Sequence, residues 1–184
     1  MPERETDAEL LRAAFRDVHG ARLHGFALAL LLGNRADASR LAAETLAHLA
    51  AEAPRLRHPE RAAAALRAEL LRRARRGAAR GTSSAEGGSA ALSRIGIDEA
   101  TGRALAGLDV AQRAALIATD IERFGDADVA VILGLSVPAA RRAAGRARSR
   151  YLARYVRPDG DRARPGSIAE RLELVASRAM GAST

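Results

Sequence analysis

The residues best suited to bind a charged partner lie in the stretch DADVAVILGLSVPAARRAAGRARSRYLARY, residues 126–155. Its second half brings Arg141, Arg142 and Arg146 close together, and residues 137–155 contain no acidic side chain. The planar guanidinium of arginine forms paired hydrogen bonds with phosphate oxygens and with the edge of guanine. This spacing therefore indicates a surface that binds a polyanion.

The elements expected around these arginines form a helix-turn-helix. Asp126 is expected to cap a short helix. Gly134 stands where a left-handed C-terminal cap is needed, and the apolar Leu135 that follows is expected to pack back on that helix. Ser136 then caps the last long helix, which tolerates Pro138 because amides of the first turn have no partner within the helix.

The last long helix is expected to bury one side and expose the other. The expected buried side consists of Val137, Ala140, Ala144, Ala147, Tyr151 and Tyr155. The candidate DNA-binding residues on the other side are Ser136, Pro138, Ala139, Arg141, Arg142, Gly145, Arg146 and Ser149. On a helix in the major groove, each paired arginine–guanine contact contributes about 1–3 kcal/mol of base discrimination.

The composition favours an all-α fold and a nucleic-acid partner. Aromatic residues make up only 3% of the chain, whereas hydrophobic residues, mostly Ala and Leu, make up 48%. Few stretches alternate in the manner of a strand. All 30 basic residues are arginine and the net charge is +8, which favours a polyanion. An Ala- and Arg-rich composition is also typical of proteins encoded by GC-rich genomes.

The sequence lacks the residues or motifs that several classes of function require. The chain has no cysteine, which excludes disulfides, thiolate catalysis and Cys-ligated zinc. Its four histidines lack metal-ligand spacing, and the acids of 120–128 lack the pattern of a calcium loop. No phosphate-binding glycine loop, nucleophile elbow or pair of catalytic carboxylates is present. We therefore expect no enzyme, no metal, no cofactor and no small-molecule substrate.

The hydropathy pattern predicts a cytoplasmic protein without membrane insertion. The longest apolar run, Phe26 to Leu32, is far shorter than the roughly 18 residues that span a bilayer. Residues 1–17 are charged throughout, unlike a signal peptide.

The chain divides by composition into four segments. Residues 7–76 are expected to be helical: Leu11, Phe15 and Val18 share a face, Gly33 and Asn34 end that stretch, and later helices begin near Ala36 and at Pro59. Residues 77–102, rich in Gly, Ser and Ala, are expected to form a flexible linker. Residues 103–156 hold the helix-turn-helix, preceded by a capping box of Asp109 and Gln112. Residues 157–184 are expected to form a spacer and a short helix.

These motifs resemble the extracytoplasmic-function sigma factors of bacterial RNA polymerase, with this chain as a diverged member. The positions in register with that family are Leu108, Gln112-Arg113, Asp120-Ile121-Glu122, Val129-Ala130, Ile132 to Ser136, and Arg146-Ala147-Arg148. The N-terminal match is looser and consists of Phe15, Leu23, Phe26, Ala27, Ala38, Leu41, Glu44, Thr45 and Glu69 to Arg73.

The resemblance implies two small helical domains with different partners. A bundle like sigma region two, over 7–76, would contact core RNA polymerase and the downstream promoter element. The helix-turn-helix of 103–156 would bind double-stranded promoter DNA at the upstream element, and an anti-sigma factor is a further implied partner. The candidate polymerase contacts are Arg40, Leu41 and Glu44. The candidate DNA contacts in the N-terminal domain are Arg72, Arg73, Arg75 and Arg76.

Departures from the family pattern leave two alternatives open. Ala139-Ala140 replaces a Thr-Val pair, and Ala143 stands where an arginine is expected. Arg40 and Ala43 replace an acid and a glutamine, and no aromatic residue occurs between Ala27 and Arg123. Arg40, Ala43 and the missing aromatic residues favour a sigma-like protein-binding module that engages an anti-sigma partner. The other alternative is a stand-alone helix-turn-helix regulator that binds a palindromic site as a dimer.

Overall fold

The computed structural model describes residues 2–51, 59–79, 89–94 and 97–155. All regular elements in these ranges are helical, which confirms the expected all-α fold. They are α1 (Pro2–Leu30), α2 (Arg35–Ala50), α3 (Pro59–Ala79), α4 (Ser89–Arg94), α5 (Glu99–Ala106), α6 (Val110–Leu116), the π-helix η2 (Ile117–Ile121), α7 (Asp126–Leu133) and α8 (Val137–Arg154). The spacer and helix expected over 157–184 lie outside the described residues.

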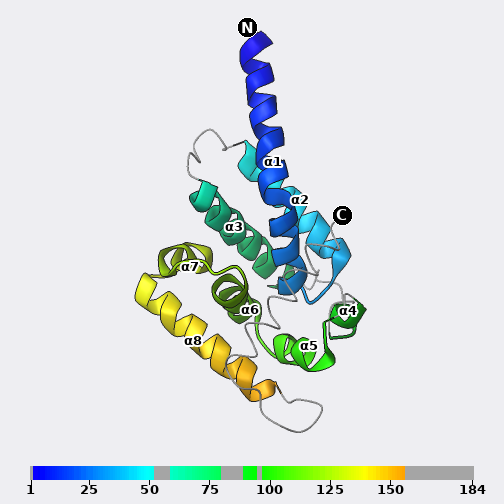
Figure 1. Ribbon diagram of the computed structural model, residues 1–184, viewed down its shortest axis with the longest axis vertical. Helices are drawn as coiled ribbons and strands as arrows, with labels where there is room; N and C mark the ends of the chain where they lie inside the picture. Colours follow the sequence, from blue (N-terminus) through cyan, green and yellow to red (C-terminus); the bar gives the residue numbers. More distant parts are fainter. Residues whose placement is uncertain (1, 52–58, 80–88, 95–96, 156–184) are drawn as a thin grey trace.

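The first three helices pack together, and the N-terminal half of α1 extends beyond the other helices (Figure 1). Their core is made of Leu23, Phe26, Ala27, Leu30, Leu41, Leu49, Leu66 and Leu70. Val18, expected on the apolar face, is instead 64% exposed. The buried face of α1 runs through His19 and Leu23, and Val18 lies about 100° away from His19 around the helix.

The turn between α1 and α2 is shaped by a glycine that the sequence analysis placed at this boundary. Gly33 has φ +79°, a left-handed conformation that glycine adopts without strain. Asn34 then caps α2, because its side chain accepts a hydrogen bond from the amide of Asp37 at 3.0 Å. A Cβ on Gly33 would lie 2.9 Å from the carbonyl carbon of Ala91, so α4 packs directly against this turn.

The described residues of the expected linker are 77–79, 89–94 and 97–102, and they are largely helical and packed, whereas 80–88 and 95–96 lie outside the described residues. Within 77–102, α3 continues to Ala79, α4 occupies Ser89–Arg94 and α5 begins at Glu99. The apolar side chains of Leu92 and Ile97 are buried. Few large side chains are needed here because the α1–α2 turn and α5 supply the opposing surface.

The C-terminal helices begin with the predicted capping box. The Asp109 side chain accepts a hydrogen bond from the amide of Gln112 at 2.8 Å, and the amide of Asp109 donates to the Gln112 side chain at 3.3 Å. This reciprocal pair satisfies amides that the first turn of α6 leaves unpaired. The prediction of a helix that begins after Asp109 is therefore confirmed.

The turn between α7 and α8 also follows the prediction in its backbone. Gly134 ends α7 with φ +67°, and the amide of Leu135 donates to the Ala130 carbonyl at 2.9 Å, as in a Schellman cap. The side chains differ from expectation. Leu135 is 45% exposed, and Gly125 rather than Asp126 is the N-cap of α7. Ser136 is the N-cap of α8, as expected, but its side chain makes no capping hydrogen bond.

Candidate nucleic-acid interface

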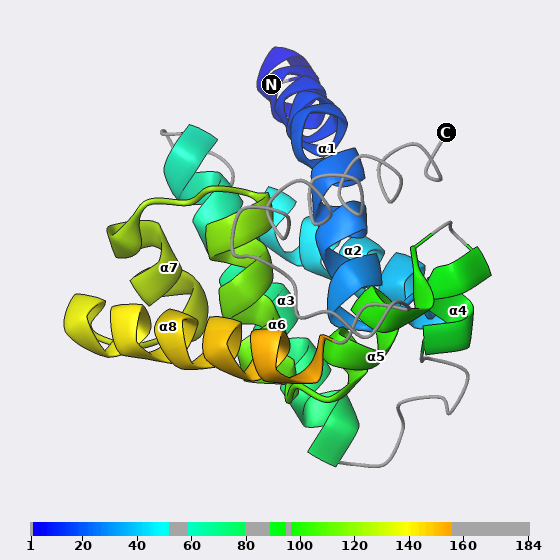
Figure 2. The ribbon, with the colours of Figure 1, turned by 60° about the horizontal axis from the view of Figure 1, so that its bottom comes forward.

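The last helix, α8, lies along the outer edge of the described molecule in both ribbon views (Figures 1 and 2). It packs on α6 and α7, and α5 contacts it as well. Its inward side is made of Ala140, Ala144, Ala147, Tyr151 and Tyr155, all buried, with Val137 half-buried. The predicted buried face is thus confirmed, and its alanines let α8 approach the helices beneath closely.

The outward side of α8 carries the candidate DNA-binding residues. Those that are exposed are Ser136, Pro138, Arg141, Arg142, Gly145, Arg146 and Ser149, while Ala139 is half-buried. Within the described part of the chain, Arg142 and Arg146 have no ion pair and no side-chain hydrogen bond. Their guanidinium groups are therefore free to bind a partner from solution.

Two other arginines of α8 are held by acids. Nε and Nη2 of Arg141 approach Oδ2 of Asp126, at the start of α7, at 2.6 and 2.5 Å. Arg148 pairs with Asp120, which is largely buried and also accepts a hydrogen bond from the Thr119 hydroxyl at 2.8 Å. Asp126 was expected only as a helix cap, and neither ion pair was predicted from the sequence.

A buried arginine joins α3 to the C-terminal helices. Arg67 is 2% exposed, and its Nε donates to Oε2 of Glu122 at 2.6 Å while Nη2 contacts the other carboxylate oxygen. Its guanidinium carbon lies 5.8 and 5.3 Å from the ring centroids of Phe26 and Phe124. A two-point ion pair between aromatic rings satisfies the buried charge and ties the two groups of helices together.

A second buried arginine joins the C-terminal helices to α1. Nε of Arg113 donates to the carbonyl of Leu30, the last residue of α1, at 2.8 Å, and Nη1 donates to the carbonyl of Leu108 at 2.5 Å. Burial lowers the pKa of Arg113, although a guanidinium stays charged in proteins. The charge is stabilised by the C-terminal carbonyl of α1, where the helix dipole is negative.

The burial of Arg67 and Arg113 was not predicted from the sequence, although one signal was present. Arg67 lies three, four and seven residues before Leu70, Leu71 and Ala74, all of which are buried. A charged residue in register with an apolar helical face indicates a buried partner. His19, on the neighbouring α1, shares this environment: burial, and secondarily the nearby Arg67 and Arg22, lower its pKa.

The arginines at the end of α3 are mostly engaged by a carboxylate of their own helix. Glu69 is 3% exposed and pairs with Arg72, with Arg73 at 2.7 Å and with Arg76 at 3.8 Å. Arg75 is exposed and has no such contact among the described residues. Of these four candidate DNA contacts, Arg75 thus has the least obstructed guanidinium.

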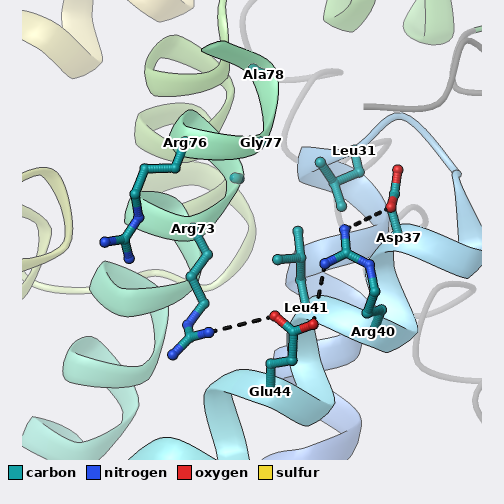
Figure 3. Close-up of a pocket in the computed structure, with 10 residues that line it drawn as sticks. Leu31, Asp37, Arg40, Leu41, Glu44, Arg73, Arg76, Gly77 and Ala78 are labelled. Carbon is teal, nitrogen blue, oxygen red and sulfur yellow. Dashed lines mark hydrogen bonds and ion pairs between the residues drawn. The ribbon is translucent and has the colours of Figure 1, made fainter. Parts of the chain in front are cut away.

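The candidate polymerase contacts line a groove of about 380 Å³ between α2 and α3 (Figure 3). Leu41 is buried at 6% exposure, which argues against a direct contact through its side chain. Arg40 pairs with Asp37 at 2.8 Å and Glu44 at 3.2 Å, and Glu44 also meets Arg73 at 3.5 Å. The hydrogen bond that Arg40 donates to Asp37, followed by the one that it donates to Glu44, raises the pKa of Arg40 against the opposing effect of burial. The rim of the groove is therefore largely self-paired.

Comparison with known proteins bears on the C-terminal helices. Residues 98–150 match the family model Sigma-70, region 4. The match extends from the start of α5 through most of α8 and covers under a third of the chain. At the level of that family, the region 4 segment is a DNA-binding helix-turn-helix of transcription, not a catalytic domain. No curated protein and no solved structure matches the chain.

The described residues contain neither a membrane-spanning helix nor a cluster of metal ligands. No helix there is long and apolar enough to cross a membrane. No group of three or more His, Asp or Glu side chains is placed to hold a metal ion in that part of the chain.

Proposed function

We propose that this protein is a sigma factor of the extracytoplasmic-function type, which directs RNA polymerase to promoters. In this proposal α8 enters the major groove of the upstream promoter element. Arg141, Arg142 and Arg146 contact base edges or phosphates there, and the N-terminal helices contact core polymerase.

The observation that carries the proposal is the exposed side of α8. Arg142 and Arg146 are exposed and unpaired in the described residues, and they belong to the segment that matches sigma region 4. Gly145 lies between them, and a Cβ built on it meets nothing within 4 Å. Glycine inside a helix costs about 1 kcal/mol relative to alanine. An exposed glycine would let a nucleic-acid backbone approach α8 closely, which accounts for glycine at this unfavourable position.

Replacing Arg142 and Arg146 with alanine, singly and together, is expected to weaken binding to duplex DNA. Each substitution is expected to remove about 1–3 kcal/mol of binding free energy if that arginine contacts a base, and the double variant should lose roughly the sum. The measurement is fluorescence anisotropy with a duplex selected by the wild-type protein from a random library.

The matched control is Arg35→Ala, which removes one exposed arginine from α2 rather than from α8. Arg35→Ala is expected to bind the duplex nearly as well as the wild type. Equal losses of affinity in all three single variants would mean that the effect comes from net charge alone, and would contradict DNA binding by α8. A palindromic selected site bound by a dimer would instead support the stand-alone regulator.

A second candidate function, a sigma-like module that binds a protein partner without polymerase, is favoured by the groove of Figure 3. There the charges of Arg40, Glu44 and Arg73 are already paired with one another. A polymerase surface would have to replace these ion pairs. Because such exposed pairs contribute only about 0–1 kcal/mol each, this cost is small, and the pairing disfavours polymerase binding without excluding it.

Association with purified bacterial core RNA polymerase separates the two candidates. We expect the wild-type chain to co-elute with core polymerase, and Glu44→Ala to weaken the complex by about 0.5–2 kcal/mol through loss of a charged contact. Glu9→Ala, which removes an exposed acid from the projecting part of α1, is the control. A wild-type chain that binds duplex DNA but never core polymerase would favour the module or the regulator.

A further inference from the structure

Among the arginines on the outward side of α8, Arg141 alone is paired with an acid of α7. Asp126 and Arg141 are 15 residues apart in sequence and meet across the helix-turn-helix turn. Both groups are well exposed, at 66% for the Arg141 side chain and 48% for that of Asp126. An exposed ion pair contributes little to stability, so its value to the fold does not account for its presence beside a polyanion-binding surface.

The geometry of the pair leaves one edge of the guanidinium open. Arg141 has five N–H groups, and those of Nε and the near side of Nη2 converge on a single oxygen, Oδ2 of Asp126. The edge formed by Nη1 and the far side of Nη2 is not used by this contact. Two parallel N–H groups on that edge match the O6 and N7 acceptors of guanine.

Asp126 occupies a position that favours a charged carboxylate, and this carboxylate holds the Arg141 side chain. It is the first residue of α7, after the N-cap Gly125, where the helix dipole favours a carboxylate. A free arginine side chain loses its rotamer freedom on binding, whereas one already held by Asp126 has lost part of it beforehand. Arg142 and Arg146 have no such support in the described residues.

We propose that Asp126 is a positioning residue that orients Arg141 for contact with a guanine, and so sets base preference at one position of the DNA site. The inference depends on the proposed DNA binding by α8. In this proposal Arg141 discriminates between bases, while Arg142 and Arg146 supply most of the sequence-independent attraction to phosphate.

The proposal predicts opposite effects of Asp126→Ala on preference and on general affinity. Removal of Asp126 frees Arg141 to sample other rotamers, so the preference for guanine at its position should fall at least about threefold. Loss of a negative charge near the phosphates should raise affinity for unrelated duplex by about two- to fivefold. Arg141→Ala should abolish the preference at the same base pair, a loss of about tenfold or more.

The test is anisotropy titration of the full chain against the selected duplex, all single-base variants of it and an unrelated duplex. The control is Asp128→Ala, which removes another acid from the first turn of α7 but not the partner of Arg141. Unchanged base preference in Asp126→Ala, or equal loss of preference in Asp128→Ala, overturns the positioning role. Absence of any duplex binding by the wild type at low salt refutes the proposed function instead.

Thermal unfolding of each variant separates orientation from folding. Asp126→Ala is expected to unfold within a few degrees of the wild type, because the pair is exposed. A variant that loses preference only at temperatures where it unfolds would contradict the inference. Asp126→Glu, which keeps the charge on a longer side chain, is expected to restore part of the preference.

Discussion

Replacing Glu122 with alanine is expected to lower the free energy of unfolding by about 3–5 kcal/mol, because the change leaves the buried charge of Arg67 without its partner. Arg67 is 2% exposed and has one remaining hydrogen bond, from Nη1 to the Ala63 carbonyl at 3.2 Å. That carbonyl does not compensate for the lost carboxylate. Urea denaturation followed by circular dichroism measures the effect.

The matched control for this prediction is Glu99→Ala, which breaks the exposed pair with Arg103. That pair should be worth at most about 1 kcal/mol. The double variant Arg67→Met with Glu122→Leu removes both charges together, and we expect it to recover most of the stability lost in Glu122→Ala. If Glu122→Ala and Glu99→Ala were equally stable, Arg67 would be solvated in solution and the two groups of helices would not be packed as described.

The affinity for duplex DNA is expected to fall roughly a thousandfold between 50 and 200 mM salt if the protein neutralises about six phosphates. The physical reason is release of the counterions condensed on the duplex, which is less favourable when the bulk salt concentration is high. The arginine-only basic composition and the exposed side of α8 supply the cations. Anisotropy titrations at several salt concentrations measure the slope of log affinity against log salt.

Individual arginines should change that slope in distinct ways. Arg142→Ala and Arg146→Ala are each expected to make it shallower by about one unit if they contact phosphate. Arg148→Ala should have a smaller effect, because Arg148 is already paired with Asp120. A flat salt dependence of the wild type would contradict phosphate binding by α8.

Much of the C-terminal architecture could be predicted because its signals act over a few residues. The capping box of Asp109 and Gln112 and the left-handed cap at Gly134 depend on backbone bonds within one helical turn. The buried side of α8 follows from helical periodicity alone. The same local rules were wrong about Leu135, which is exposed, and about Asp126, whose carboxylate binds Arg141 instead of capping α7.

The sequence by itself determined that the chain is helical, where its best-capped helices begin and end, and which side of α8 faces outward. Only the tertiary structure decided which arginines are available, since the same guanidinium is buried in Arg67 and exposed in Arg142. Arg67 meets Glu122 from 55 residues away, and Arg113 meets the Leu30 carbonyl from 83 residues away. Helical periodicity specifies a direction around one helix but not the atoms on the next, so these long-range pairs appear only when the helices pack.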